Sequence, residues 1–212
     1  RARWPDHVRH GVKIELHKNL PVAAGLGGGS AGAAAALRLM SESGEGEIPQ
    51  KALAEVALSL GADVPACLLG RPCEVRGKGE IVHALKGFPT SHLVLINPLV
   101  PVVTADVFRR LQKRDNDGLP PLPGPLTRPA QLGIWLGETR NDLEAPAIAL
   151  VPQIGELIDA IARVDSCILA RMTGSGGTVF GLFGSAARAH QAAHDLRERY
   201  PSHWVAAAQV LV

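Results

Sequence analysis

The 212-residue sequence has few aromatic residues, few cysteines and no long apolar run, and each shortage excludes a class of protein. Phenylalanine, tryptophan and tyrosine make up only 4% of the chain, so a platform that stacks nucleic-acid bases is not expected. The three cysteines, Cys67, Cys73 and Cys167, form no C-x-x-C pair and indicate reduced thiols instead of a disulfide framework. No run of about eighteen apolar residues occurs, which argues against a membrane span.

An excess of charge of one sign is also lacking. Lysine and arginine number 22 against 20 aspartates and glutamates, and this net charge of +2 gives no reason to expect a nucleic-acid partner. The polar and basic residues 1–9 are not followed by the apolar stretch of a secretory signal. Hydrophobic residues at 46% and charged residues at 20% are typical of a globular protein with a sizeable core.

What the sequence does contain is a glycine-rich segment near its start, followed by an alanine-rich helix predicted over 32–40. The segment reads Pro21-Val22-Ala23-Ala24-Gly25-Leu26-Gly27-Gly28-Gly29-Ser30-Ala31. Glycine allows positive φ and leaves no Cβ between backbone amides and a ligand. A helix N-terminus adds unpaired N–H groups and the positive end of a dipole. We therefore predict that the segment binds the phosphates of a nucleotide and that Ser30 caps the helix.

The order of residues in the segment argues against two other kinds of phosphate-binding loop. A Walker loop needs a lysine before its Ser or Thr, and no lysine lies between Lys18 and Lys51. A dinucleotide-binding G-x-G-x-x-G loop would have glycine or alanine where Ser30 stands, and no acidic ribose ligand follows at the usual distance. The remaining alternative is that the glycines only make a tight turn into a packed helix.

Hydrophobic periodicity predicts a mixture of strands and helices without an internal repeat. Strands are expected at 12–16, 73–76, 81–83, 93–96, 167–172, 178–183 and 204–212. Helices are expected at 32–40, 53–60, 104–111 with Thr104 as its cap, 154–161 and 189–196. A concentration of prolines makes 115–129 a loop. The pattern indicates an α+β fold in which residues 84–90 cross between domains.

Several motifs, taken together, resemble one family. The glycine-rich segment is similar to the second signature of the GHMP kinase superfamily, and 25–30 resembles its form in the branch of 4-diphosphocytidyl-2-C-methyl-D-erythritol kinases. Further segments resemble motifs of that branch in the same order: 61–65 (Gly-Ala-Asp-Val-Pro), 77–80 (Gly-Lys-Gly-Glu), 141–144 (Asn-Asp-Leu-Glu) and 172–180 (Met-Thr-Gly-Ser-Gly, then Val-Phe). The resemblance extends over nearly the whole chain.

The resemblance implies a two-domain α+β architecture. An N-terminal ATP-binding domain, related to domain 2 of ribosomal protein S5, would occupy 1–86, and a ferredoxin-like C-terminal domain would occupy 87–212. Residues 1–18 do not reproduce the family's first signature, which contains a lysine paired with the catalytic aspartate and residues that hold cytidine. The chain is therefore expected to be an N-terminally truncated member, with the N-terminal domain incomplete.

The resemblance also implies a catalytic residue and a phosphate site. Asp63 would be the base that accepts a proton from the substrate hydroxyl, the alternative being an aspartate that only satisfies backbone N–H groups in a turn. Gly174, Ser175 and Gly176 would approach the phosphate-binding segment from the other domain, or would form a plain hairpin turn. Residues 141–144 have capping-box spacing and are interpreted as structural.

Substrate binding is implied for Thr104 and Phe108. The family has an aromatic ring at this point that stacks on cytosine, although helical spacing alone favours Phe108 as a core residue. ATP and Mg²⁺ are the expected cofactors; no metal ligand is certain, and Ser30 is only a candidate. Gly32 departs from the acidic or amide residue usual in the branch. His190 and His194, four residues apart without a glutamate between them, are expected to face solvent.

The activity that the resemblance implies is ATP-dependent phosphorylation of the 2-hydroxyl of 4-diphosphocytidyl-2-C-methyl-D-erythritol, a step of the non-mevalonate isoprenoid pathway. We expect a cytoplasmic, bacterial enzyme with a small-molecule substrate, without nucleic-acid or membrane partners, as a monomer or weak homodimer. Two alternatives stay open. One is another GHMP kinase, of homoserine or mevalonate type, and the other is a truncated fragment that binds nucleotide without catalysis.

Overall fold

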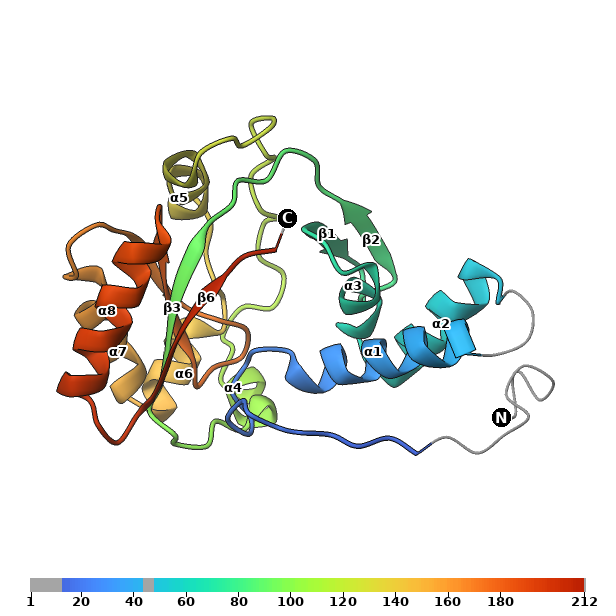
Figure 1. Ribbon diagram of the computed structural model, residues 1–212, viewed down its shortest axis with the longest axis horizontal. Coiled ribbons are helices and arrows are strands. Elements are labelled where there is room, and N and C mark those ends of the chain that lie inside the picture. The colour runs from blue at the N-terminus through green and yellow to red at the C-terminus, as the bar shows by residue number, and fades with distance from the viewer. Residues whose placement is uncertain (1–12, 44–47, 212) are drawn as a thin grey trace. The chain divides into compact units, whose positions relative to one another are not determined.

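The computed structural model describes residues 13–43 and 48–211, and the chain forms two compact units (Figure 1). The N-terminal unit contains the chain up to Asn19 and Gly27–Leu85, whereas the C-terminal unit contains Leu20–Leu26 and Lys86–Val212. The short segment Leu20–Leu26 thus belongs to the C-terminal unit, although the next residues begin a helix of the N-terminal unit. The domain boundary predicted at residue 86 stays a prediction.

The described part of the N-terminal unit contains three helices and a β-hairpin. The helices are α1 (Gly28–Ser43), α2 (Gln50–Leu60) and α3 (Val64–Leu69), and the hairpin is formed by β1 (Cys73–Arg76) and β2 (Ile81–Ala84). The core of this unit is small, and it is built from Ala34, Leu37, Ala57 and Val64. Alanine at two of these four positions lets the helix backbones approach closely. The predicted end of α2 at residue 60, directly before Gly61, and the predicted hairpin are both confirmed.

Two predictions for this unit are wrong. Residues 13–16 form no strand, and Ile14 and Leu16 are 65% and 75% exposed. A strand requires hydrogen bonds to a neighbouring strand, which alternation in the sequence does not supply; Val12 lies outside the described residues. Helix α1 begins at Gly28, so Ser30 is its third residue and not its cap. The first turn closes instead through Ala31 N–H, which donates to Gly27 O at 2.8 Å.

A four-stranded antiparallel sheet organises the C-terminal unit. Its strands are β3 (His92–Asn97), β4 (Cys167–Met172), β5 (Val179–Phe183) and β6 (Trp204–Gln209), in the order β4-β5-β3-β6. The link from β3 to β4 carries α4 (Thr104–Arg109), α5 (Pro129–Gly137), α6 (Glu144–Leu150) and α7 (Gln153–Ala162), and α8 (Ala186–Arg199) links β5 to β6. This strand order, with the two linking helices α7 and α8, is ferredoxin-like. The predicted α+β class and C-terminal fold are confirmed.

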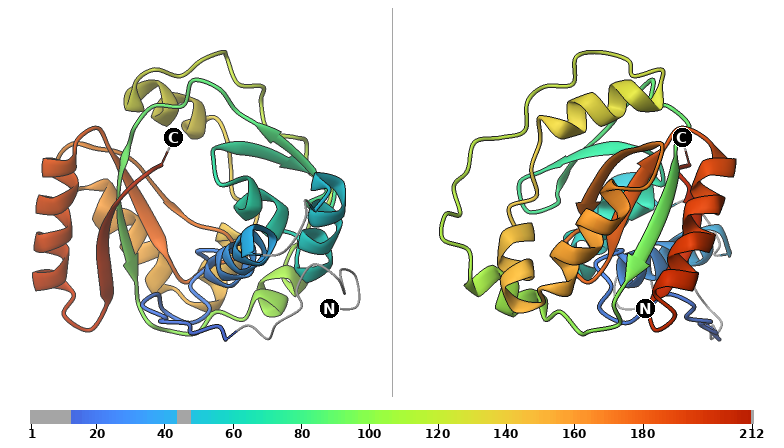
Figure 2. Two further views of the ribbon diagram at one scale, coloured as in Figure 1. Left: turned by 45° about the vertical axis from the view of Figure 1, so that its right-hand side comes forward. Right: turned by 90° about the vertical axis from the view of Figure 1, so that its left-hand side faces the viewer.

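Helices cover both faces of this sheet (Figure 2). Helices α7 and α8 pack on one face, where Leu157, Ile161 and Ala193 join Val94 and Phe183 in the main core. Helix α5 packs on β4 and β5 from the other face, through a second cluster that includes Leu132 and Leu182. A sheet held from both sides gives a firm base for the turn that joins β4 to β5.

Helices α4 and α5 of the C-terminal unit also depart from the prediction. Thr104 is the first residue of α4 and makes no cap bond, because Val103 occupies the N-cap position. Phe108 is 47% exposed, so its interpretation as a core residue is wrong. Helix α5 was not predicted, because it begins at Pro129, at the end of the proline-rich loop. In the described part of the chain, no helix is both long and apolar enough to cross a bilayer.

Candidate phosphate-binding site

The glycine-rich segment and the turn between β4 and β5 touch each other inside the C-terminal unit. Thr173 Oγ1 donates a hydrogen bond to Gly25 O at 3.2 Å. Gly25 has φ +68°, and a Cβ there would lie 2.6 Å from Gly176 O and 2.7 Å from Thr173 O. Only glycine fits so close an approach of two backbones. The structure therefore brings predicted phosphate-site residues from the two motifs together, within one unit and not across two as predicted.

The turn itself is tightly bonded. Thr173 N–H donates to Thr178 O at 3.0 Å, and Gly176 N–H donates to Thr173 O at 3.2 Å. Thr178 is fully buried, and its Oγ1 accepts a hydrogen bond from Asn97 Nδ2 at 2.9 Å. A hydrogen bond within such a dry site fixes both side chains, because neither has access to water as an alternative partner.

Asn141 and Glu144 hold the same turn from a different segment. Asn141 Nδ2 donates to Met172 O at 3.2 Å and to Gly174 O at 2.9 Å, and Glu144 Oε2 accepts from Met172 N–H at 2.9 Å. The predicted capping box is therefore wrong, because the Glu144 carboxylate binds β4 and the N-cap position of α6 is taken by Leu143. Sequence reasoning missed this role, since the partners lie about thirty positions further along the chain.

Two candidate substrate residues lie on α4, next to the turn. Thr104 Oγ1 and Ser175 Oγ are 2.8 Å apart and share a hydrogen bond. Phe108 follows Thr104 by four residues and so projects from the same side of the helix. The structure thus joins Thr104 to Ser175, and it leaves the half-exposed ring of Phe108 on a helix that starts at that contact.

The start of α1 presents open backbone. Gly27, Gly28 and Gly29 are exposed, and a Cβ placed on Gly27 or Gly29 would meet nothing within 4 Å. The first N–H groups of a helix have no partner within it, so these amides are available to an anion. Ser30, half-buried, is the first side chain beyond them.

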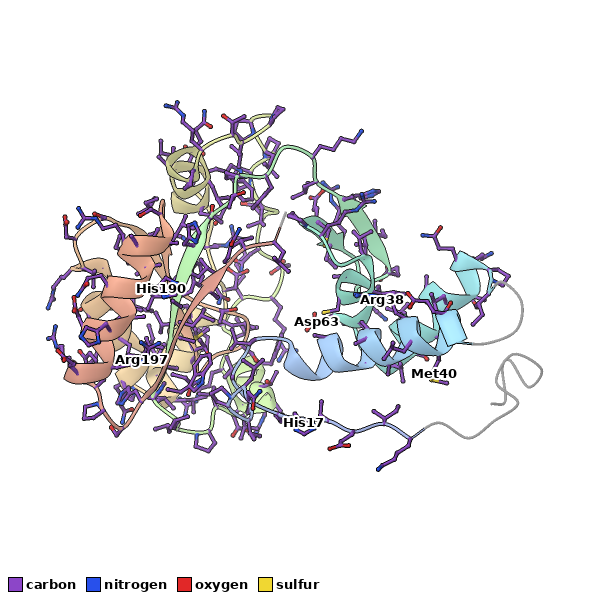
Figure 3. All side chains as sticks on the ribbon, viewed as in Figure 1. His17, Arg38, Met40, Asp63, His190 and Arg197 are labelled. Atoms are coloured by element: carbon purple, nitrogen blue, oxygen red, sulfur yellow. The ribbon has the colours of Figure 1, made fainter. Side chains whose placement is uncertain are left out.

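Asp63 lies directly before α3 with an exposed side chain. Its carboxylate makes no cap hydrogen bond, and none of the described residues forms an ion pair with it. The backbone beside it is held against α1, because Val64 is buried with Ala34 and Leu37, and Arg38 donates to Cys67 O. Figure 3 shows Asp63 and Arg38 beside α3. The turn-stabilising role considered for this carboxylate is not observed.

A thiol lies one helical turn from Asp63. Burial raises the pKa of Cys67, the charge of Asp63 raises it further, and the guanidinium of Arg38 opposes both effects. The thiol is therefore protonated near neutral pH and does not add a second negative charge beside the carboxylate.

The histidines that the structure describes do not form a metal site. His190 is exposed on α8, where Figure 3 labels it. His194 is also exposed on α8, and its Nε2 lies 3.6 Å from the carboxylate of Glu198. Across residues 13–43 and 48–211, no three His, Cys, Asp or Glu side chains are grouped so that they could hold a metal ion.

Comparison with known proteins matches both units. Residues 1–71 match the GHMP kinases N terminal domain, and residues 126–202 match the GHMP kinases C terminal domain. A curated 4-diphosphocytidyl-2-C-methyl-D-erythritol kinase from Cereibacter sphaeroides is 46% identical over 204 residues, which cover 94% of this chain and 71% of the relative. The chain belongs to this kinase family. A member from Mesorhizobium japonicum is also 46% identical, over 93% of this chain and 66% of its own length.

Solved structures agree with membership of the 4-diphosphocytidyl-2-C-methyl-D-erythritol kinase family. A crystal structure of 4-(cytidine 5'-diphospho)-2C-methyl-D-erythritol kinase matches with a TM-score of 0.72 and 33% identity, over 92% of this chain and 70% of that one. A homoserine kinase from Cytophaga hutchinsonii matches with a TM-score of 0.67 at 20% identity, which shows a shared fold alone. The chain spans about two thirds of the length of the curated family members it matches.

Proposed function

We propose that this chain carries the phosphate-binding and catalytic residues of an ATP-dependent kinase that phosphorylates the 2-hydroxyl of 4-diphosphocytidyl-2-C-methyl-D-erythritol. The proposal rests above all on the contact between Gly25 and the turn 173–177. Gly25 and Thr173, which form its hydrogen bond, are 148 positions apart in the sequence. Family membership supplies the substrate, since relatives 46% identical to this chain bear that name.

ATP would bind through backbone amides. Residues 21–31 would hold its phosphates, and the turn residues Gly174, Ser175 and Gly176 are candidate neighbours of this segment, because the turn contacts Gly25 within one unit. The exposed amides at 27–29 are supported as phosphate ligands by their position at the start of a sixteen-residue helix, whose dipole favours an anion there. Lysine is not needed for this contact, because unpaired N–H groups supply the positive potential.

Mg²⁺ would enter with the nucleotide. This ion retains waters and prefers phosphate and one or two protein oxygens to a complete protein cage. The hydroxyl oxygen of Ser30, close to the start of α1, could serve as the single protein ligand in such partial coordination. The ion would neutralise phosphate charge, and Ser30 is the candidate protein ligand.

Asp63 would accept the proton of the substrate hydroxyl as the bond to the γ-phosphoryl group forms. Its carboxylate is exposed and has no cap hydrogen bond, so a substrate hydroxyl would have no protein donor to displace. General-base assistance of this kind contributes roughly 10²–10⁴-fold to rate. Thr104 and Phe108 would contact the substrate, with the half-exposed ring of Phe108 stacking on the cytosine.

The test measures ATP binding and ADP release separately. The purified chain is given Mg-ATP and the cytidyl methylerythritol substrate, beside Asp63→Asn and a matched control, Asp195→Asn. Asp195 is an exposed carboxylate on α8 that accepts a hydrogen bond from Gln191. We expect Asp63→Asn to bind ATP normally and to lose at least about 10²-fold in kcat, while the control stays unchanged.

Three other results would argue against the proposal. Turnover of homoserine or mevalonate in place of the cytidyl substrate would assign a different GHMP kinase. ATP binding without turnover of any acceptor would indicate a nucleotide-binding fragment. Full activity of Asp63→Asn would refute the assignment of the base.

A further inference from the structure

Asn141 and Glu144 converge on three backbone groups of one short stretch, 172–174. The Asn141 amide donates to the carbonyls of Met172 and Gly174, and the Glu144 carboxylate accepts from the N–H of Met172. Met172 is the last residue of β4, so both its N–H and its C=O are bonded to these two side chains at the point where the strand becomes a turn. These hydrogen bonds therefore fix the backbone at the position where β4 ends and the turn begins.

The orientation of the Asn141 side chain is itself fixed. Leu143 N–H donates to Asn141 Oδ1 at 3.0 Å, so the oxygen is occupied on its own segment and the nitrogen faces the turn. Helix α6 also packs beneath the turn, because a Cβ on Gly176 would lie 3.3 Å from Ala147 Cβ. The segment 141–147 therefore holds the turn by side-chain bonds and by close packing at the same time.

The turn that Asn141 and Glu144 bind also contacts the glycine-rich segment. Thr173 lies between the two carbonyls that Asn141 binds, and its hydroxyl donates to Gly25 O. A Cβ on Gly174 would lie 2.8 Å from the same Gly25 oxygen. Gly25 precedes the first residue of α1 by only three positions. A displacement of the turn would therefore move the backbone that leads into the exposed helix start.

We infer that Asn141 and Glu144 are positioning residues for ATP: they fix the turn 172–177, and the turn fixes Gly25, from which the chain leads directly into the amides at 27–29. The inference rests on the proposed function, because it takes those amides as the phosphate ligands. Neither side chain needs to touch the nucleotide. Their loss weakens ATP binding and leaves the chemical step of bound ATP intact.

The test compares two substitutions with matched controls. Asn141→Asp keeps the oxygen that binds Leu143 N–H but sets a second oxygen against two carbonyls. Its control, Asn116→Asp, makes the same change in a loop where Asn116 Nδ2 has only a 3.5 Å contact with Lys113 O. Glu144→Ala removes the acceptor of Met172 N–H, whereas Glu144→Gln keeps an oxygen there and is expected to restore ATP binding.

Three quantities are measured for each variant: the Kd and KM for ATP, kcat at saturating ATP, and amide hydrogen exchange over 20–27. Asn141→Asp and Glu144→Ala should raise the Kd for ATP roughly tenfold, as expected when partly buried hydrogen-bonding groups lose their partners. They should leave kcat near the wild-type value and speed exchange at 20–27. A merely structural role would instead lower the folded fraction, and so lower apparent kcat at unchanged KM.

Unchanged ATP affinity in both substitutions would overturn the inference, and so would an equal effect of Asn116→Asp. If the wild-type chain binds no ATP, the proposed function fails, and the exchange measurement still decides whether Asn141 and Glu144 hold the glycine-rich segment. Faster exchange at 20–27 in Asn141→Asp, and not in its control Asn116→Asp, would show that Asn141 restrains the glycine-rich segment. Unchanged exchange in Asn141→Asp would refute this.

Discussion

Replacement of Gly25 by alanine tests the contact on which the proposed site depends. An alanine Cβ at this position would lie 2.6 Å from Gly176 O, 2.7 Å from Thr173 O and 3.1 Å from Gly176 N. All three atoms belong to the backbone of a bonded turn, so no flexible side chain can move aside. Either the turn or the glycine-rich segment must shift.

Two terms contribute to the expected loss of stability. A side chain at φ +68° costs about 1 kcal/mol relative to glycine. Forcing a methyl group into a packed site costs about 1–3 kcal/mol more. Reduced entropy of the unfolded chain returns about 0.5 kcal/mol. The free energy of unfolding of the C-terminal unit should therefore fall by about 1.5–3.5 kcal/mol, and ATP affinity should fall with it.

Gly27→Ala is the matched control. Gly27 has nearly the same backbone angle, φ +64°, but a Cβ there would meet nothing within 4 Å. Its substitution carries the backbone cost of about 1 kcal/mol without the steric cost. Gly27 belongs to the N-terminal unit, so urea unfolding is followed by far-UV circular dichroism, which reports on both units, beside tryptophan fluorescence in a Trp4→Phe background, whose signal comes from Trp135 and Trp204 of the C-terminal unit. Equal losses in the two variants would refute the steric argument, and so would a Gly25→Ala loss below about 0.5 kcal/mol.

Two other predictions concern the C-terminal unit. Thr178→Val keeps the shape of a fully buried side chain but leaves Asn97 Nδ2 without its acceptor, so urea unfolding should show a loss of stability of about 1–3 kcal/mol. The control Thr127→Val, at an exposed site, should change stability by less than about 0.5 kcal/mol. An equal effect at both sites would contradict the argument. Burial raises the pKa of the Cys167 thiol, so in a chain with Cys67→Ser and Cys73→Ser the alkylation rate should reach its midpoint at a higher pH in the folded protein than in urea. Because the folded state disfavours the thiolate, stability should also decline as pH rises past the pKa of the unfolded thiol, and a midpoint at or below that of the unfolded chain would contradict this prediction.

Elements with a strong local pattern were predictable from the sequence. The apolar residues of α7 and α8 recur at helical spacing, and those of β3 and β5 form short apolar runs between turn residues, so each element is specified by residues a few positions apart. Residues 13–16 alternate as well as a strand should, yet a strand also needs a neighbour that alternation does not provide. The short helix α3 has too few residues to show a period.

The candidate site was predictable as a set of motifs but not as an arrangement. Glycines at 25–29 and the Gly-Ser-Gly of 174–176 indicated backbone binding of phosphate from residue type alone. The motif at 141–144 looked like a helix cap, because capping-box spacing is local, whereas its partners lie on β4 and the turn after it. Phe108 looked like a core residue by spacing, and only the packing of α4 shows that its ring is half-exposed.

The sequence by itself determined the family, the chemistry of the glycine-rich segment and most of the helices and strands, because these depend on residue identity and on short-range spacing. The tertiary structure alone decided that Gly25 contacts the turn 173–177 and that Asn141 and Glu144 hold this turn. Such contacts join residues that are 28 to 148 positions apart. They exist only once the antiparallel sheet has brought the end of β4 to a definite place, because a hydrogen bond depends on where two atoms meet and not on their distance along the chain.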